Sequence, residues 1–166
     1  RGALSANKGW DRVFRDLMLP DDTDAAMKGA AEFLKARVTD ADKLTNDVSV
    51  SFFGVNVSCA QCHDHPLVKD WTQDHFYGMK AFLARTYDAG GQLAERGFGL
   101  VKYKANKGPE KVAPMMFLTG AKLDHESARE MTKDEQKQEK ALQEAAKKGK
   151  KAPPAPAFSA RAKLVE

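Results

Sequence analysis

Two cysteines and a histidine carry the most distinctive chemistry of this sequence. They occur together in the run Cys59-Ala60-Gln61-Cys62-His63. Cys-x-x-Cys-His is the attachment pattern of c-type haem. Two thiols at this spacing on a helical turn can each form a thioether with one vinyl group of the porphyrin, and the adjacent imidazole then lies beneath the iron as an axial ligand. The pattern predicts one covalent haem c per chain, attached to Cys59 and Cys62 and ligated by His63.

Three further interpretations of the two thiols stay open. A redox dithiol of the thioredoxin type belongs in a parallel α/β pattern, whereas the surroundings here are expected to be helical. A structural zinc site is the stronger rival, because Cys59, Cys62, His65 and His75 are four ligands of suitable type. That site would have wide ligand spacing and would leave His63 without a function. Two inert thiols beside an incidental histidine are the third possibility. The thiols are too close in sequence to cross-link distant parts of a fold.

The ligand on the far side of the iron decides between electron transfer and reactivity, and the sequence leaves it open. Met115 and Met116 follow a proline in an apolar segment, which suits a thioether ligand. His75 lies on the next expected helix, from which the chain is just long enough to return to the iron. Met79 on that helix, His125 and water are further candidates for this position, which could also stay open.

His65 is a poor candidate for that position. It follows His63 by two residues, so its side chain would have to pass around the edge of the porphyrin. We expect His65 instead to hydrogen-bond a propionate, a backbone carbonyl or Asp64, or to lie on the surface.

Apolar periodicity indicates the elements that would position this site. It predicts helices over residues 10–19, 25–38, 40–53 and 72–84. Pro20 ends the first of them, Gly54 ends the third, and Thr72 is the expected N-cap of the fourth. Flat, apolar walls suited to a porphyrin precede and follow the motif. They are Phe52, Phe53, Val55, Val57, Leu67, Trp71, Phe76, Tyr77 and Phe82.

The remaining chain reads as loops followed by a charged segment. We expect a loop or irregular hairpin over 87–108, a compact apolar segment over 114–118 closed by Gly120, and a solvated helix or disordered insertion over 131–151. The predicted fold is mostly α: a small helical c-type cytochrome domain with long loops and a charged C-terminal helix or insertion.

The predicted domain organisation has three parts. Residues 1–128 form the monohaem domain and its ordered core, 129–151 form the insertion, and 152–166 form a proline-rich linker and the start of a following segment. The chain begins at Arg1 and stops within an expected helix, so we interpret it as a piece of a longer protein whose export signal lies elsewhere.

Composition narrows the function classes. With 42% hydrophobic and 30% charged residues the chain reads as globular, and it contains no apolar run long enough for a membrane span. The net charge of +4 comes largely from the lysine-rich segment near the C-terminus. Because basic residues do not form a stripe interleaved with aromatics, the sequence does not favour nucleic-acid binding.

Longer runs around the motif carry a more specific resemblance. They are Phe52-Phe53-Gly54-Val55, Cys59-Ala60-Gln61-Cys62-His63-Asp64-His65-Pro66, Trp71-Thr72-Gln73-Asp74, Phe76-Tyr77-Gly78 and Ala81-Phe82. With them the chain resembles the planctomycete cytochrome C family, closely over 48–84 and more loosely over 9–120. That resemblance implies a domain of a large exported protein. Met115 and Met116 depart from the family, in which similar proteins have a basic and an aromatic residue.

The expected function is electron transfer by a six-coordinate haem c, without a substrate and with a redox partner domain or protein as donor or acceptor. The chain is therefore expected to be an electron-transfer module more than an enzyme. The alternative is a haem enzyme or gas-binding domain with an open sixth position, and a zinc-stapled interaction module is a third class. Haem attachment in bacteria takes place outside the inner membrane, so the motif and the resemblance together imply a periplasmic or otherwise exported domain.

Overall fold

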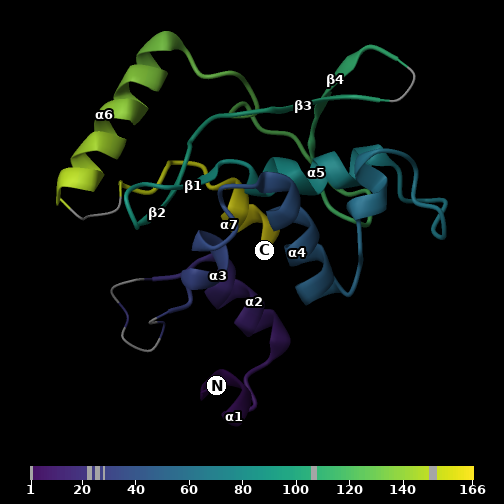
Figure 1. Cartoon of the computed structure of the whole chain (residues 1–166), viewed down its shortest axis with the longest axis horizontal. Coiled ribbons are helices and arrows are strands. Elements are labelled where there is room, and N and C mark those ends of the chain that lie inside the picture. Colours follow the sequence, from purple (N-terminus) through teal and green to yellow (C-terminus); the bar gives the residue numbers. More distant parts are fainter. Residues whose placement is uncertain (1, 22–23, 25–26, 28, 106–107, 150–152) are drawn as a thin grey trace.

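The computed structural model of the chain describes residues 2–21, 24, 27, 29–105, 108–149 and 153–166. Its helices are α1 (Gly2–Ser5), α2 (Trp10–Met18), α3 (Glu32–Lys35), α4 (Ala41–Phe53), α5 (Gln73–Leu83), α6 (Lys133–Gly149) and α7 (Ala160–Leu164), with a 3-10 helix over Ser58–Gln61. Its strands are β1 (Thr86–Asp88), β2 (Leu93–Glu95), β3 (Val101–Lys104), β4 (Glu110–Ala113), β5 (Met115–Met116) and β6 (Lys122–Leu123). Figure 1 shows α5 near the centre, in contact with α4 and α7, and α6 at the edge.

The fold is a mixed α/β fold, with 43% helix and 12% strand, so the expectation of a mostly α domain is wrong. The strands form antiparallel two-stranded sheets, β1–β2, β3–β4 and β5–β6. Apart from the loop or irregular hairpin expected over 87–108, the strands were not predicted, because each is only two to four residues long. β3 alternates buried Val101 and Tyr103 with exposed Lys102 and Lys104, but an alternation over four residues is too short to stand out in a sequence.

Helix α4 begins and ends where the sequence predicts. The Asp40 carboxylate accepts hydrogen bonds from the amides of Asp42 and Lys43, both at 3.0 Å, and so caps the first turn. Gly54 ends the helix in the left-handed conformation, at φ 69°, which a residue with a side chain rarely adopts. Leu44 and Val48 point from α4 into the core.

Helix α5 is the centre of the core. It carries fully buried Phe76, Met79 and Leu83, and it packs against α4, β5 and α7. Gly78 lets β5 approach closely, because a Cβ atom at this position would lie 2.6 Å from the Cβ of Met116. The predicted helix over 72–84 and its Thr72 N-cap are confirmed.

The first two predicted helices differ in outcome. The helix over 10–19 is confirmed as α2. The helix over 25–38 is wrong in extent, because the described part of that range is α-helical only over Glu32–Lys35. Gly29 adopts a positive φ of 85°, which interrupts a regular helix. Residues 25–26 and 28 lie outside the described part of the chain.

The glycine-rich segment after α5 forms a hairpin. β1 pairs with β2, Tyr87 opposite Ala94, and the connecting turn contains Gly90 and Gly91 at positive φ. The next pair, β3 and β4, places Tyr103 opposite Lys111. The apolar segment after Pro114 is likewise a short hairpin, β5 with β6, closed by Gly120 as expected.

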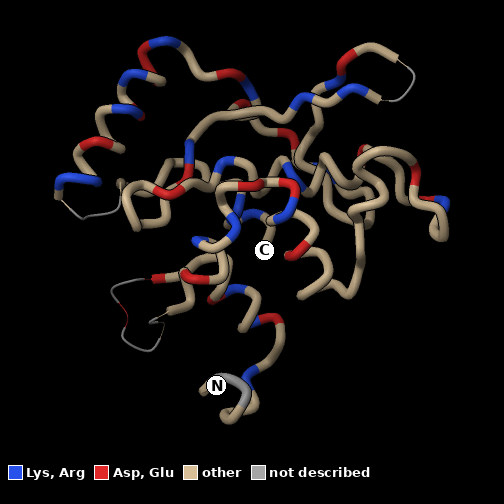
Figure 2. The backbone as a smooth tube through the Cα atoms, viewed as in Figure 1, with Lys and Arg blue, Asp and Glu red and all other residues tan. Residues whose placement is uncertain are grey.

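The charged segment forms helix α6, and Figure 2 shows basic and acidic residues distributed along it. Ala146 of α6 packs against Ala89 and Ala94 of the β1–β2 hairpin, and Glu139 accepts a hydrogen bond from Arg96 Nε at 2.7 Å. These contacts attach α6 to the rest of the molecule.

The core does not end near residue 128. Ala160 and Leu164 of α7 belong to the same buried cluster as Phe76 and Met79, and α7 packs on α5. The division of the chain into three parts otherwise stays a prediction. Among the described residues, no helix has the length and apolar character that crossing a membrane requires.

Candidate functional site

Cys59 lies on the short 3-10 helix between α4 and α5, and Cys62 is the C-cap of that helix. Val57 precedes this helix and Ala60 lies within it, and both are fully buried, so they anchor it to the core. Cys59 is half-buried, Cys62 is exposed, and both thiols are free. The amides of Cys62 and His63 point back to the carbonyl oxygen of Cys59, at 3.4 and 3.3 Å. The motif therefore occupies one helical turn, with its thiols toward the surface.

The turn is tied to both neighbouring long helices through Gln61. The side-chain amide of Gln61 donates to the Asp42 carboxylate of α4 at 2.9 Å. Its backbone carbonyl accepts hydrogen bonds from Gln73 Nε2 at 3.0 Å and from Tyr77 Oη at 3.2 Å, both on α5. These contacts fix the position of the turn between α4 and α5. Sequence reasoning did not find Gln61 and Gln73 as positioning residues, because no spacing rule marks a glutamine that bonds a distant carbonyl.

His63 is exposed, and one of its ring nitrogens has a partner. Its Nδ1 lies 2.7 Å from the backbone carbonyl oxygen of Asp64. A carbonyl oxygen only accepts hydrogen bonds, so this contact requires the proton on Nδ1. The lone pair is then on Nε2, which is the nitrogen available to a metal ion.

A cavity of about 440 Å³ lies beside His63. It is lined by His63, Asp64, Thr72, Gln73, Asp74, Ala105 and Lys111. Lys111 Nζ lies 3.8 Å from Asp74 Oδ1, and the Tyr103 hydroxyl donates to the same carboxylate oxygen. Burial and this hydrogen bond raise the pKa of Tyr103 above its ordinary value. The cavity wall is therefore polar, with a lysine and a carboxylate near its rim.

Two stacked tyrosines connect this wall to the cysteine turn. The rings of Tyr77 and Tyr103 lie 4.1 Å apart at an interplanar angle of 11°. Burial is the largest cause that raises the pKa of Tyr77, followed by the charges of Asp42 and Cys62. Tyr77 thus connects the Gln61 carbonyl to the β3–β4 hairpin.

His65 closes the loop that follows the motif. Its Nδ1 accepts hydrogen bonds from the backbone amides of Leu67 and Val68, at 3.2 and 3.1 Å. Its own amide donates to the carbonyl of Trp71 at 2.8 Å, and its ring meets the Trp71 ring edge-on at 5.6 Å. Nδ1 therefore accepts from two amides of the loop, and a carbonyl, Asp64 or propionate partner of His65 stays a prediction.

The candidates for the sixth ligand lie elsewhere. Met115 and Met116 are 1% and 3% exposed and pack in the core, as does Met79. His75 completes the capping box of α5, with its Nδ1 3.2 Å from the Thr72 amide. Among the described residues that line the cavity beside His63, none of these four is found. The structure therefore keeps Cys59, Cys62 and His63 together and leaves the sixth ligand a prediction.

A structural zinc site would require the side chains of four residues to point toward one metal position. These residues are Cys59, Cys62, His65 and His75. His65 and His75 each use Nδ1 for a local backbone amide, one in the loop and the other at the helix cap. Within the described part of the chain, no group of three or more His, Cys, Asp and Glu side chains is placed to hold a metal ion.

Comparison with known proteins identifies a family. Neither curated proteins nor solved structures give a match. One family model matches residues 1–88, a span that runs from the N-terminal helices through the cysteine turn and α5 into β1. This match agrees with the resemblance to planctomycete cytochrome domains. Because it covers more than half of the chain, the chain belongs to the PSCyt2 family, which is described as a protein of unknown function (DUF1549).

Proposed function

We propose that the chain is a monohaem c-type domain that transfers electrons within a larger exported protein, with haem attached to Cys59 and Cys62 and ligated by His63. The observation that carries this proposal is the hydrogen bond between His63 Nδ1 and the Asp64 carbonyl. Iron-ligating histidines use the second ring nitrogen in this way, which fixes the tautomer and the ring orientation. Nε2 of His63 is thus left for a metal beside two free thiols on the same turn.

The residues around the motif fit such a group. Attachment adds each thiol across one vinyl double bond, with sulfur going to one carbon and the proton to the other, so it needs no oxidant and the thiols must be unpaired. Cys59 and Cys62 meet this condition. Lys111 on the wall of the neighbouring cavity offers a positive charge of the kind that a propionate needs. When bound, haem supplies one-electron redox chemistry.

The chain's own residues would hold and orient the group. Gln61 fixes the turn to α4 and α5, so that the two sulfur atoms and the imidazole keep their relative positions. The exposure of Cys62 and His63 leaves this part of the surface accessible to a redox partner. An accessible attachment site supports electron transfer with a partner domain or protein. We also propose that the protein is exported, because bacteria attach haem c outside the inner membrane.

A second candidate function is a haem domain with an open sixth position that binds small gas molecules. The burial of Met115 and Met116 in the core, away from the cavity beside His63, favours it. Optical spectra in the ferric and ferrous states, with and without carbon monoxide, separate the two functions. A low-spin spectrum unchanged by carbon monoxide supports electron transfer. A high-spin ferric spectrum and ready carbon monoxide binding support the gas-binding domain.

The primary test is the mass of the protein. The chain is produced in a bacterial host that performs c-type maturation, and intact-protein mass spectrometry is expected to show the polypeptide plus one haem. Cys59→Ala and Cys62→Ala each remove one attachment point, whereas Ser58→Ala on the same turn is the matched control and keeps the full adduct. Only bare polypeptide from the wild-type gene would overturn the proposal.

A further inference from the structure

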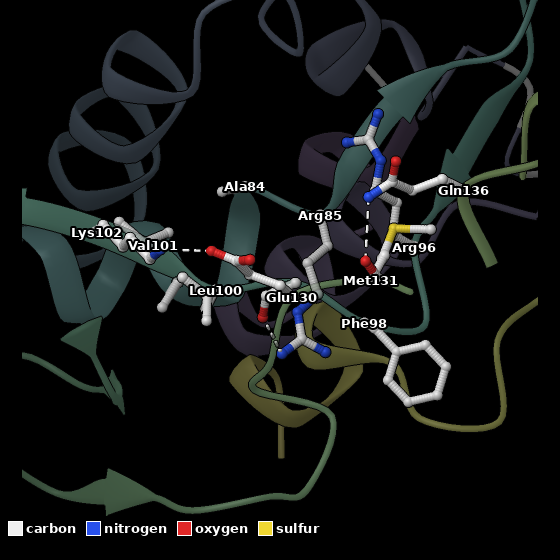
Figure 3. A pocket seen from close by; sticks show the side chains of 12 residues that line it. Ala84, Arg85, Arg96, Phe98, Leu100, Val101, Lys102, Glu130, Met131 and Gln136 are labelled. Carbon is white, nitrogen blue, oxygen red and sulfur yellow. Dashed lines mark hydrogen bonds and ion pairs between the residues drawn. The ribbon is translucent and has the colours of Figure 1, made fainter. Parts of the chain in front are cut away.

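A second cavity, of about 450 Å³, lies among the end of α5, the start of β3 and the segment before α6. Figure 3 shows its lining, with Lys102 and Arg96 on opposite sides and Arg85 between them. The cysteine motif contributes no residue to this lining. The cavity therefore calls for an explanation of its own.

Arg85 is the most unusual residue of this cavity. It is only 4% exposed, and its terminal nitrogens donate to the carbonyls of Gly97 and Gly99 and to Ser127. These partners are neutral, so they satisfy donors without balancing the charge. The Nε–H of Arg85 is buried without a partner among the described residues. A guanidinium stays charged in a protein, and burial without a counter-charge is costly.

The nearest buried carboxylate is already shared. Glu95 accepts hydrogen bonds from the Ser159 hydroxyl, at 2.5 Å, and from the amide of Arg161, at 2.9 Å. Its carboxylate also lies 4.0 Å from Nε of Arg161, a second buried guanidinium with unpartnered nitrogens among the described residues. Burial lowers the pKa of both Arg85 and Arg161, and Glu95 offsets it only in part. One buried carboxylate thus faces two buried cations, which leaves an excess of positive charge.

Two further cations border the cavity nearer to solvent. Arg96 donates through Nε to Glu139 at 2.7 Å and lies over the Tyr87 ring, 4.6 Å from its centroid. Within the part of the chain that the structure describes, neither Nη atom of Arg96 has a hydrogen-bond partner. Lys102 is paired with Glu130. The rim therefore contains carboxylates as well as cations, and the unbalanced charge lies deeper, at Arg85.

The remaining wall is apolar. Phe98, Leu100, Val101 and Met131 line the cavity together with Ala81 and Ala84. Such a wall favours a ligand with an apolar body over an inorganic ion. The Glu130 carboxylate in the lining and the Glu139 carboxylate that is paired with Arg96 would repel a dianion such as phosphate more than a single negative charge.

We propose that this cavity binds a small organic monocarboxylate, with the carboxylate on the side that Arg85 and Arg96 line and the apolar body against Phe98, Val101 and Met131. The ligand supplies the negative charge that the neutral partners of Arg85 do not provide. This site is independent of the cysteine motif, so the outcome of its test does not depend on the haem proposal.

The test is calorimetric titration of the full chain with benzoate, with the neutral isostere benzamide as the matched ligand control. Benzoate is expected to bind at least about tenfold more tightly than benzamide, a difference of about 1.4 kcal/mol. Arg96→Gln is expected to weaken benzoate binding about tenfold or more, because it removes a charge-assisted pair of donors. Arg12→Gln, which changes an exposed arginine of α2, is the matched protein control and leaves the affinity within about twofold.

A second pair of variants on strand β3 compares Lys102→Gln, at a position that lines the cavity, with Lys104→Gln, at a position that does not. Equal binding of benzoate and benzamide, no measurable benzoate binding, or unchanged binding by Arg96→Gln would overturn the proposal. Tighter binding of inorganic phosphate than of benzoate would overturn the choice of an organic ligand.

Discussion

The side-chain amide of Gln73 donates a hydrogen bond to the backbone carbonyl of Gln61 across 3.0 Å, and so joins the first turn of α5 to the helical turn that carries the thiols. Tyr77, one helical turn further along α5, donates to the same oxygen at 3.2 Å. Two donors on one face of α5 therefore converge on a single acceptor in the motif. The position of the cysteines depends on a long-range contact as well as on their own spacing.

Replacing these donors is expected to destabilise the turn. Gln73→Ala should lower the free energy of unfolding by about 1–3 kcal/mol, because it deletes a buried hydrogen bond and leaves space behind. Gln138→Ala, at an exposed position on α6, is the matched control and is expected to change stability by no more than about 0.5 kcal/mol. Urea unfolding followed by circular dichroism measures both.

Because Gln73 and Tyr77 donate to the same carbonyl, the effects of removing them on stability are expected to be non-additive. Each single variant, Gln73→Ala or Tyr77→Phe, leaves the Gln61 carbonyl one side-chain donor, whereas the double variant leaves it neither. The double variant should therefore lose more stability than the two single losses added together, by at least about 0.5 kcal/mol. Strict additivity would contradict the shared role of the carbonyl.

Gly78 is expected to tolerate no side chain. In Gly78→Ala the new Cβ would lie 2.6 Å from Met116 Cβ and 2.9 Å from the Met116 carbonyl oxygen, and the backbone oxygen cannot move aside cheaply. We expect a loss of about 1–3 kcal/mol in unfolding free energy from overpacking. Gly149→Ala, at the end of α6 with nothing within 4 Å of the new Cβ, should be neutral or slightly stabilising. Equal melting temperatures for the two variants would show that β5 has room to withdraw from α5.

Helices α2, α4 and α5 could be predicted from the sequence because each carries an apolar period over several turns and a recognisable cap or stop. Asp40 and Gly54 mark the two ends of α4 with local interactions that a sequence displays directly. The hairpins were predicted only in part, as a loop or irregular hairpin over 87–108, since each strand has four residues or fewer. α7 was not predicted to belong to the core, because a helix of five residues after a proline-rich segment has too few apolar positions to indicate that it packs on another helix.

The candidate site likewise has a part that the sequence predicts and a part that only the structure reveals. Cys59, Cys62 and His63 are adjacent in sequence, so their spacing alone indicates the chemistry they share. The tautomer of His63 depends on a carbonyl one residue away, and the attachment of Gln61 depends on α4 and α5, which no spacing rule reveals. The cavity around Arg85 joins residues from α5, the β2–β3 connection and the start of α6, so it appears only in three dimensions.

The N-terminus of α6 is expected to respond to acid. Glu135 accepts two hydrogen bonds from the Arg129 guanidinium and one from the Thr132 amide, which lowers its pKa from the ordinary value near 4.5 to about 2. A carboxyl with a lowered pKa in the folded state stabilises the fold above its unfolded pKa, and this contribution disappears as the pH falls from about 4.5 to about 2. NMR chemical shifts of the α6 amides should therefore change across that window.

Glu135→Gln is expected to remove this part of the pH dependence, because an amide does not titrate. Glu144→Gln, at an exposed position on the same helix, is the matched control and should keep the wild-type profile at the start of α6. Identical acid titrations of the wild type and Glu135→Gln would show that the capping contacts do not hold the carboxyl ionised.

The two histidines of the motif loop are expected to behave differently once haem is attached. His63→Gly should keep the covalent mass of the haem adduct, because both thiols remain, but it removes the proposed iron ligand and should change the Soret spectrum. Added imidazole should restore the original spectrum by occupying the space that the side chain leaves. His65→Ala is the matched control, since its Nδ1 is engaged by the amides of Leu67 and Val68, and it should keep the wild-type spectrum while it loosens the loop. A normal spectrum for His63→Gly together with an altered one for His65→Ala would assign the iron to the wrong imidazole and reverse the proposal for these two residues.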